Sequence, residues 1–425
     1  MDAKEEPVRT VQQVFVPGGQ PTFSYYDRRS LRLEQMIDDY LKSSGRVLSL
    51  TGSTKCGKTV AIRRVLGSQA ILLAGGNIKT VEDFWTQLAY RADAFSGEEI
   101  RLDDVEKLAG GGHIGVNFGV ADAQLSGSSE GSVSRGRSQT REIPLALATT
   151  DKLIATKRPL VIDDFHYIPR SAQRDVLRAI RPIIFESVPV ILISVPHRGE
   201  DAVRAEPELN GRVQQLHVPL WSPDELAAIA VAGYQALNLA PSKDLLEVLA
   251  GQASGSPHLM QEFCLQAALR EGFRTREPVL KPFDVENREE FFQHCALQTF
   301  SRVDMRKFLT GPQQRGARKP RTLRHSPEPP VDIYFATILA LCTFGPREKI
   351  TYNELRAAFR LVLIDADMPQ KHEITRVLGK MHDIALAGDG EPVLEWDPDQ
   401  EILHITDPFF AFLLRSLSGS GRPVD

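Results

Sequence analysis

Cysteines, long apolar runs and net charge are all scarce in this sequence, and each scarcity excludes a class of protein. The 425 residues include only four scattered cysteines, too few for a disulfide framework and without metal-ligand spacing: Cys56, Cys264, Cys295 and Cys342. No apolar run approaches the roughly 18–20 residues that span a bilayer, and the stretch MDAKEEPVRT lacks the apolar centre of a signal peptide. The net charge is −4, from 51 basic and 55 acidic residues, so contact with nucleic acid would depend on local patches. We therefore expect a soluble, cytoplasmic protein without a membrane partner.

An alternation of short apolar runs with helical patterns occupies residues 46–221. Hydrophobic residues make up 42% of the chain and charged residues 25%, which allows a well-buried core in each of two or three domains. We predict strands at 47–52, 70–75, 160–165, 188–195 and 214–220, and helices at 58–66, 81–92 and 171–185. This pattern predicts an α/β fold with a parallel sheet covered by helices on both faces. A glycine- and serine-rich segment at 109–141 interrupts it, as a weak hairpin, a partner-binding element or a solvated loop.

The flanking regions have other patterns. Residues 1–45 combine a turn-rich lead with a helix at 30–43. Residues 222–300 contain only helical patterns, at 222–234, 242–253 and 257–273, and we expect them to form an all-α helical lid on the α/β core. Residues 301–330 are basic and proline-rich without periodicity, which predicts a linker that is either a solvated hinge or a contact for a nucleic-acid backbone. Residues 331–420 show three helices, two short strands at 392–396 and 401–405, and a last helix, the order of a winged-helix domain.

A phosphate-binding motif lies between the first predicted strand and the helix that follows it. GSTKCGKT, residues 52–59, fits the pattern G-x-x-x-x-G-K-(S/T) in the required strand-loop-helix context. Gly52 and Gly57 allow backbone N–H groups to turn around phosphates, Lys58 can reach the β- and γ-phosphates, and the Thr59 hydroxyl can ligate Mg²⁺. The loop residues between the glycines, which we expect to contact the nucleotide with them, are Ser53, Thr54, Lys55 and Cys56. The motif predicts the binding of a nucleoside triphosphate.

Two further predicted strands end in residues that suit the same chemistry. Asp163 and Asp164 follow a buried strand, so we expect Asp163 to hold Mg²⁺ and Asp164 to polarise the attacking water. His166 follows them, as an ordinary loop residue or as part of the site. The strand at 188–195 brings Ser194 to its tip with Arg198 just beyond, and either can contact the γ-phosphate.

The order of these motifs resembles that of the STAND class of P-loop ATPases (signal-transduction ATPases with numerous domains) within the AAA+ group, over about residues 25–415. The resemblance rests on GSTKCGKT, VIDDFHYI, ISVPHR, the GSP at 255–257 and a C-terminal DPFFAFLLR. It implies bound ATP or ADP, with Pro257 near the base or ribose and His258 in the place of a phosphate-sensing residue. Ser256 and Pro257 also suit a simple helix start. Residues 207–230 resemble AAA+ initiators and clamp loaders, in which Arg212 would act on a neighbouring subunit's γ-phosphate; a surface salt-bridge residue is the alternative.

Together, these expectations predict that the protein is a slow ATPase that acts as a molecular switch. Its nucleotide state would control conformation, self-association or the engagement of partner proteins that supply an effector or sensor, and a role in bacterial signalling or defence is compatible with such a core. The alternatives are a DNA-acting AAA+ ATPase of the initiator, loader or transposition-regulator type, and a nucleotide-binding scaffold without turnover. Lys371, His372, Arg376 and Lys380 on the third helix of the winged-helix pattern favour DNA, whereas the acidic wing PVLEWDPDQEI disfavours it.

Overall fold

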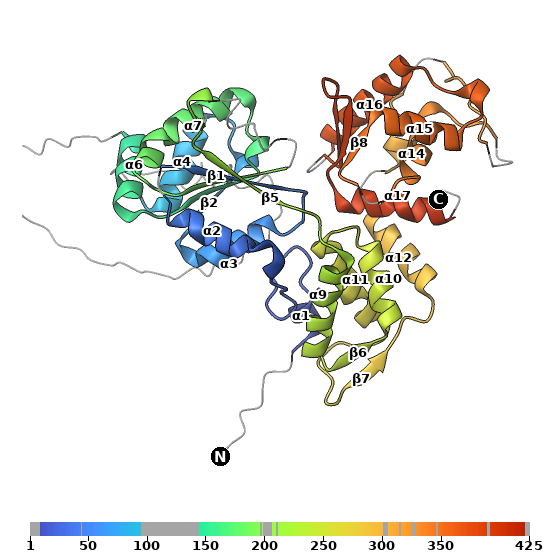
Figure 1. Cartoon of the computed structure of the whole chain (residues 1–425), viewed down its shortest axis with the longest axis horizontal. Coiled ribbons are helices and arrows are strands. Elements are labelled where there is room, and N and C mark those ends of the chain that lie inside the picture. The colour runs from blue at the N-terminus through green and yellow to red at the C-terminus, as the bar shows by residue number, and fades with distance from the viewer. Residues whose placement is uncertain are drawn as a thin grey trace, which may run out of the picture.

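In a computed structural model the described residues form three units (Figure 1). They are an α/β core, a helical unit and a C-terminal unit, and the structure describes residues 9–43, 45–94, 144–195, 198, 206–209, 211–300, 305–313, 316–324, 329–345, 347–388 and 392–420. The predicted insertion at 109–141 lies outside these residues. In Figure 1 the core and the C-terminal unit lie side by side, and both adjoin the helical unit.

Five parallel strands form the sheet of the α/β core, as the apolar runs predict. They are β1 (Val47–Gly52), β2 (Ile71–Ala74), β3 (Leu160–Asp163), β4 (Val190–Ser194) and β5 (Val213–Val218). Their order in the sheet is β2-β3-β4-β1-β5, so β4 separates the strand that precedes the phosphate loop from the strand that ends in Asp163. All carboxyl ends of these strands therefore meet at one edge, where ligands bind in open parallel sheets.

Helices cover both faces of this sheet, which is why its central strands are continuous apolar runs. On one face lie α4 (Val81–Ala92), α6 (Leu145–Thr156) and α7 (Arg170–Phe185); on the other lie α2 (Leu33–Leu41) and α3 (Lys58–Leu66). Helix α6 is absent from the prediction. Its sequence, LALATTDKLIAT, buries only Thr149 and Leu153, so it carries little of the periodicity that indicates a helix.

The helical unit contains more than the predicted helices. Its helices are α9 (Pro223–Ala236), α10 (Lys243–Gln252), α11 (Pro257–Arg270) and α12 (Arg288–Phe300). The parallel pair β6 (Leu239–Pro241) and β7 (Lys281–Phe283) corrects the expectation of helices only; three residues are too few to show a period of two.

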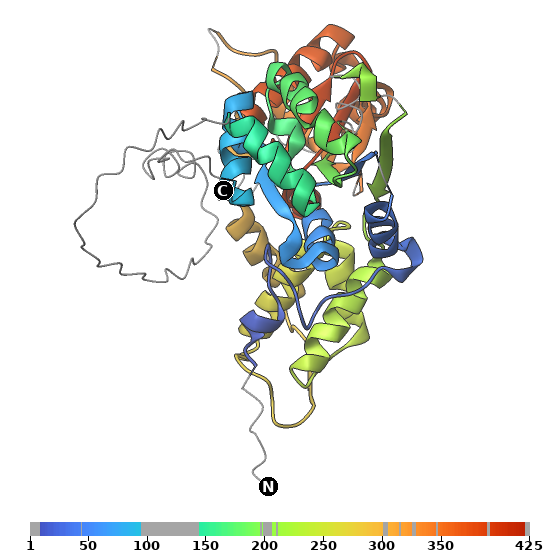
Figure 2. The ribbon, with the colours of Figure 1, turned by 90° about the vertical axis from the view of Figure 1, so that its left-hand side faces the viewer.

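The N-terminal lead contains a short helix that the sequence does not predict, ahead of the turns that it does predict. Helix α1 (Val11–Val14) has a Thr10 cap, and Val11, Val14 and Phe15 are completely buried in the core of the helical unit. Phe15 occupies a slot at Gly233, where a Cβ atom would come within 2.2 Å of its ring. We call residues 9–28 the N-terminal strap, because they run from the helical unit towards the α/β core (Figure 2).

The C-terminal unit has the predicted helices and a three-stranded antiparallel sheet. Its elements are α14 (Ile333–Cys342), β8 (Lys349–Thr351), α15 (Tyr352–Val362), α16 (Lys371–Leu386), β9 (Leu394–Asp397), β10 (Ile402–Ile405) and α17 (Pro408–Ser420). The strand order β8-β10-β9 adds β8 to the two predicted strands.

The described residues of the basic segment at 301–330 include a short helix and a buried arginine, which the sequence does not predict. The helix is α13 (Met305–Thr310), whose Met305 and Phe308 are buried. Arg321 is only 1% exposed, and its guanidinium donates to the Asp367 carbonyl at 2.6 Å and the Glu373 carboxylate at 2.7 Å. Arginine side chains can satisfy buried hydrogen-bond acceptors. A basic stretch can therefore be packed into a folded unit and need not be a solvated linker between units.

The helical and C-terminal units share one hydrophobic core, whereas the two faces of the α/β core are separate clusters. Phe412 of α17 packs against Phe263 of α11 with ring centroids 5.0 Å apart, and Phe410 lies 5.4 Å from Phe308. The described residues thus form two bodies, one made of the α/β core with its two clusters and the other of the helical and C-terminal units with their shared core. Within the described residues, no helix is both long enough and apolar enough to cross a membrane.

Candidate nucleotide site

The phosphate loop connects the end of β1 to the start of α3 and depends on its two glycines. A Cβ atom at Gly52 would lie 2.8 Å from the carbonyl oxygen of Val218 and 2.9 Å from the Cys56 sulfur. Gly57 has a φ of +97°, a left-handed conformation that favours glycine. The loop therefore needs glycine at one position for space and at the other for backbone conformation.

Side chains of the loop meet the carboxyl edge of the sheet. Lys58 is buried, and its ammonium donates to the carbonyl oxygens of Gly52 and Ser53, both at 2.7 Å. The Thr59 hydroxyl donates to the Asp163 carboxylate at 2.8 Å, across the end of the intervening β4. A hydroxyl and a carboxylate are the hard oxygen ligands that suit Mg²⁺, so this pair fits the ion that the motif implies.

Asp164 and Ser194 also lie at this edge. Asp164 adopts a left-handed conformation, with φ +54°, directly after β3. Gly75, after β2, packs against it so closely that a Cβ atom there would lie 2.3 Å from the Asp164 carbonyl oxygen. Ser194 is buried at the tip of β4, in register with Thr51 of β1. The edge therefore gathers the carboxylates, the serine and the phosphate loop.

His166 and Arg198, two other predicted residues, have different surroundings. The ring of His166 lies 4.2 Å from that of Tyr167 in the short 3₁₀ helix Phe165–Tyr167. Arg198 reaches the C-terminal unit, where its guanidinium contacts the Glu395 carboxylate of β9 at 3.3 Å. In this conformation the Arg198 guanidinium is therefore paired with a carboxylate of the C-terminal unit.

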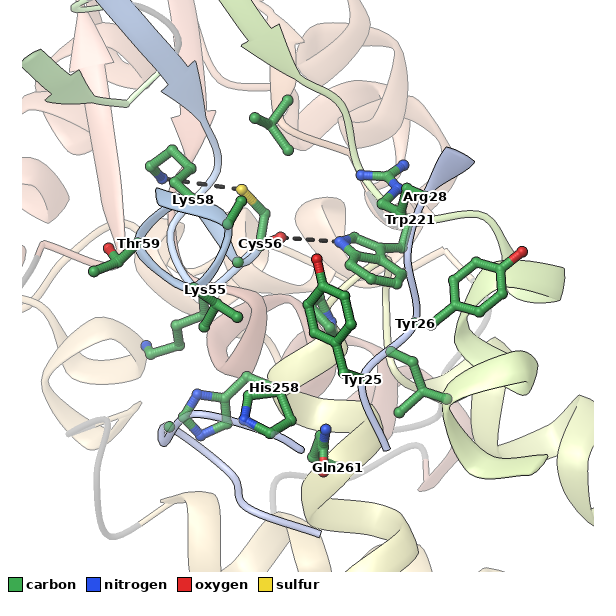
Figure 3. A pocket seen from close by; sticks show the side chains of 18 of the residues that line it. Tyr25, Tyr26, Arg28, Lys55, Cys56, Lys58, Thr59, Trp221, His258 and Gln261 are labelled. Atoms are coloured by element: carbon green, nitrogen blue, oxygen red, sulfur yellow. Dashed lines mark hydrogen bonds between the residues drawn. The ribbon is translucent and has the colours of Figure 1, made fainter. Parts of the chain in front are cut away.

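A cavity of about 490 Å³ adjoins the phosphate loop between the α/β core, the N-terminal strap and the helical unit (Figure 3). Its walls are mostly apolar, as is typical of small-molecule sites. Pro257 and His258 line it, and Ser256 caps α11 by accepting from the Leu259 N–H at 3.3 Å, so a helix start and a place in the site coexist. The His258 ring stands edge-on to Phe409 at 5.1 Å.

Sequence reasoning does not find the strap and the tryptophan that enclose this cavity. The Trp221 indole N–H donates to the Cys56 carbonyl oxygen at 2.9 Å, and the Arg28 guanidinium lies over its ring at 4.6 Å. Arg28 also pairs with Glu225 at 2.9 Å. Burial alone would raise the pKa of the Glu225 carboxyl, but hydrogen bonds from Arg28 and Ser222 outweigh it and lower that pKa. No local signal marks these contacts, because they join segments far apart in the chain.

Gln261 is also a lining residue that the sequence reasoning misses. It follows Pro257 by four positions on α11, and residues at i and i+4 share one face of a helix. That spacing is the signal that could have found it.

The outer side of the phosphate loop is in contact with the C-terminal unit. Ser53 donates to Glu348, and Lys55 pairs with Asp407. The Thr54 hydroxyl donates to the Thr406 carbonyl oxygen at 2.7 Å. These contacts are polar, in contrast to the apolar packing between the helical and C-terminal units.

Arg212 lies away from the phosphate loop of its own chain. It immediately precedes β5, and its carbonyl oxygen accepts from the Val47 N–H at 2.9 Å, at the amino edge of the sheet. Its side chain is exposed. Action on the nucleotide of the same chain is therefore excluded by position, and action on a neighbouring subunit stays a prediction.

The sheet order, the covering helices and the loop between β1 and α3 define a P-loop NTPase fold, as the sequence predicts. A Walker-type ATPase from Pyrococcus abyssi has a similar fold, with a TM-score of 0.52 and 14% sequence identity over 92% of this chain and 96% of that chain. At this identity the likeness concerns the fold alone.

Two other solved structures align more loosely. The Aeropyrum pernix ORC2 protein has a TM-score of 0.47 and 12% identity over 96% of this chain and 97% of that chain. A STAND protein with a tetratricopeptide repeat sensor from Pyrococcus horikoshii has a TM-score of 0.36 and 15% identity over 92% of this chain and 42% of that chain. No protein-family model and no curated protein sequence matches the chain.

Proposed function

We propose that the chain binds ATP and ADP with Mg²⁺ at this site, hydrolyses ATP slowly, and acts as a nucleotide-dependent conformational switch. One observation carries the proposal: the phosphate loop has the Lys58–Thr59–Asp163 arrangement on its sheet side and contacts with the C-terminal unit on its outer side. A phosphate that enters the loop therefore changes the same short segment that the C-terminal unit holds.

The residues of the edge divide the chemistry among them. Mg²⁺ would neutralise charge on the β- and γ-phosphates, held by Thr59 and Asp163. Lys58 would exchange its two carbonyl acceptors for phosphate oxygens, and Asp164 would orient the attacking water. Ser194 and Arg198 would contact the γ-phosphate, for which Arg198 must first leave Glu395. Pro257 and His258 would line the base and ribose end of the site.

The C-terminal unit is, in this proposal, a winged-helix domain whose β9–β10 hairpin is the wing. It moves together with the helical unit, because the two share one hydrophobic core. ADP would favour the form in which Lys55 pairs with Asp407, and ATP would favour a form in which these contacts are released for self-association or for a protein partner. Such a switch requires that the two nucleotides bind the two forms with different affinities.

A DNA-acting AAA+ ATPase is the second candidate, supported by the exposed Arg212 and by the element order of the C-terminal unit. The charges of that unit favour the switch. Two basic residues on α16 are paired with acids, Lys371 with Glu401 at 2.5 Å and Lys380 with Asp383 at 3.0 Å. Three arginines in the segment before α14 also form ion pairs with carboxylates: Arg318, Arg321 and Arg324. These pairs leave less positive charge available to bind the phosphates of DNA.

Purified protein tests the proposal directly. Lys58→Ala should abolish ATP binding, and Asp164→Asn should retain binding but lose turnover, whereas the exposed Lys42→Ala should change neither. Binding is measured by calorimetry and turnover by phosphate release, with and without duplex DNA at two salt concentrations. Submicromolar ATP binding by Lys58→Ala would remove the site assignment. Several-fold stimulation by DNA that is lost at higher salt would favour the second candidate.

A further inference from the structure

Gln261 is a buried polar residue on the wall of the cavity that the proposed function uses for the base. It is 5% exposed and lies one helical turn beyond Pro257 on α11. Figure 3 shows Gln261 and His258 on one wall, across from Cys56 and Trp221. Polar side chains at this degree of burial ordinarily have all their hydrogen-bonding groups engaged.

The orientation of the Gln261 amide follows from its neighbours. Its oxygen Oε1 accepts from the Val16 backbone N–H at 3.0 Å and lies 3.1 Å from the Ser24 hydroxyl. The Val16 N–H can only donate, so the reversed amide would place two donors against each other. Oε1 is therefore occupied, and the amide group Nε2 is the one that faces the cavity. Within the part of the chain that the structure describes, the hydrogen bonds of the Gln261 side chain are the two to Oε1, and Nε2 makes none.

The position of Gln261 relative to the phosphate loop indicates which part of a nucleotide meets it. His258 stands near the loop, because its ring contacts Phe409, over which the Lys55 ammonium lies at 4.8 Å. Gln261 lies about 5 Å farther along the helix, one turn away. A nucleotide anchored by its phosphates reaches farthest with the base edge opposite the ribose. In adenine that edge carries the acceptor N1, whereas in guanine it carries the donors N1–H and the 2-amino group.

We propose that Gln261 determines base specificity: its Nε2 donates a hydrogen bond to N1 of adenine, whereas in guanine the same Nε2 would face the donor N1–H and could form no hydrogen bond with it. This inference rests on the proposed function, because it assumes that the phosphates occupy the loop. A buried donor left without an acceptor costs binding free energy, and a site built around one hydrogen bond rejects ligands that cannot form it. The strap thus contributes to recognition through Val16 and Ser24, which hold the amide in place.

Base analogues test the inference on the unaltered protein. ATP, GTP, 1-deaza-ATP and 7-deaza-ATP would each compete with a fluorescent ATP analogue at equilibrium. We expect 1-deaza-ATP and GTP to bind about tenfold more weakly than ATP, since each lacks the N1 acceptor, and 7-deaza-ATP to bind within about twofold of ATP. Equal binding of ATP and 1-deaza-ATP would overturn the inference and leave the proposed function intact. A protein that binds no nucleotide would overturn both.

A variant then assigns the effect to the side chain. Gln261→Glu keeps an acceptor for the Val16 N–H and replaces the donor by an acceptor, so ATP affinity should fall about tenfold and the difference between ATP and 1-deaza-ATP should disappear. Gln266→Glu on the same helix is the matched control, because Gln266 donates to Glu262 at 3.0 Å outside the cavity lining. The control should keep the difference. A difference that persists in Gln261→Glu would overturn the assignment.

Discussion

At the scale of single residues, Gly75 packs so closely against Asp164 that no side chain larger than the hydrogen atom of glycine fits at position 75. The atoms that a Cβ would meet are backbone atoms, at 2.3 Å from the Asp164 oxygen and 3.0 Å from the Asp163 oxygen, and they cannot swing away as a flexible side chain would. Gly75→Ala should therefore displace both aspartates, lower stability by about 1–3 kcal/mol and reduce ATP turnover about tenfold or more.

The neighbouring Gly76 provides the control for this prediction. A Cβ there has no atom within 4 Å, so Gly76→Ala should leave stability within about 1 kcal/mol and turnover unchanged. Thermal unfolding and phosphate release measure the two effects. Normal turnover in Gly75→Ala would mean that the aspartates do not need their present backbone positions.

At the scale of elements, Asp407 joins the start of α17 to the phosphate loop. One oxygen accepts from the N–H groups of Phe409 at 2.6 Å and Phe410 at 3.3 Å, and the other pairs with Lys55. Asp407→Asn keeps the first set of contacts and removes the charge from the second, whereas Asp407→Ala removes both.

These two substitutions separate helix capping from the contact with the loop. Loss of a cap costs about 0.5–2 kcal/mol, so Asp407→Ala should be the less stable of the two by about 1 kcal/mol in denaturant unfolding. Both should release ADP faster than the unaltered protein. In the proposed switch the form that holds ADP is the one in which Lys55 pairs with Asp407, and both substitutions weaken that pair. Stopped-flow release of a fluorescent ADP measures this, and an unchanged rate in Asp407→Asn would contradict a role for the pair in holding nucleotide.

Prediction from sequence succeeds for elements with strong local patterns. The five strands and the long amphipathic α7 follow from apolar runs and helical spacing, and the loop at 52–59 follows from its glycines. The order of the strands does not, because nothing in the sequence shows that β4 inserts between β3 and β1. Short elements such as α1 and α13 are not predicted, because four to six residues are too few to show a helical periodicity.

The residues of the candidate site also fall into those that the sequence predicts and those that it does not. Lys58, Thr59 and Asp163 belong to motifs whose context is local, and the structure brings them together. The strap, Trp221 and Gln261 reach the site through tertiary packing between distant segments, which composition and periodicity do not encode.

At the scale of the whole molecule, the two bodies meet partly through polar contacts at the phosphate loop and β9. Asp407→Asn combined with Glu395→Gln removes the charges opposite Lys55 and Arg198. We expect this double variant to have a larger radius of gyration in small-angle X-ray scattering, with the secondary structure retained. Asp365→Asn, which breaks the pair with Arg324 inside the C-terminal unit, should not expand. An unchanged radius in the double variant would show that other contacts hold the bodies together.

The strap also has a consequence for the synthesis of the protein. Val16 and Gln261, which meet at the cavity wall, are 245 positions apart in the chain. Contacts of such long sequence separation form late, because the intervening chain must first be brought together. The strap leaves the ribosome before the helical unit does, so the slot for Phe15 and the helix that carries Gln261 do not exist until later residues have been made. A nascent chain that stops short of α11 therefore has a phosphate loop but lacks one wall of the cavity beside it.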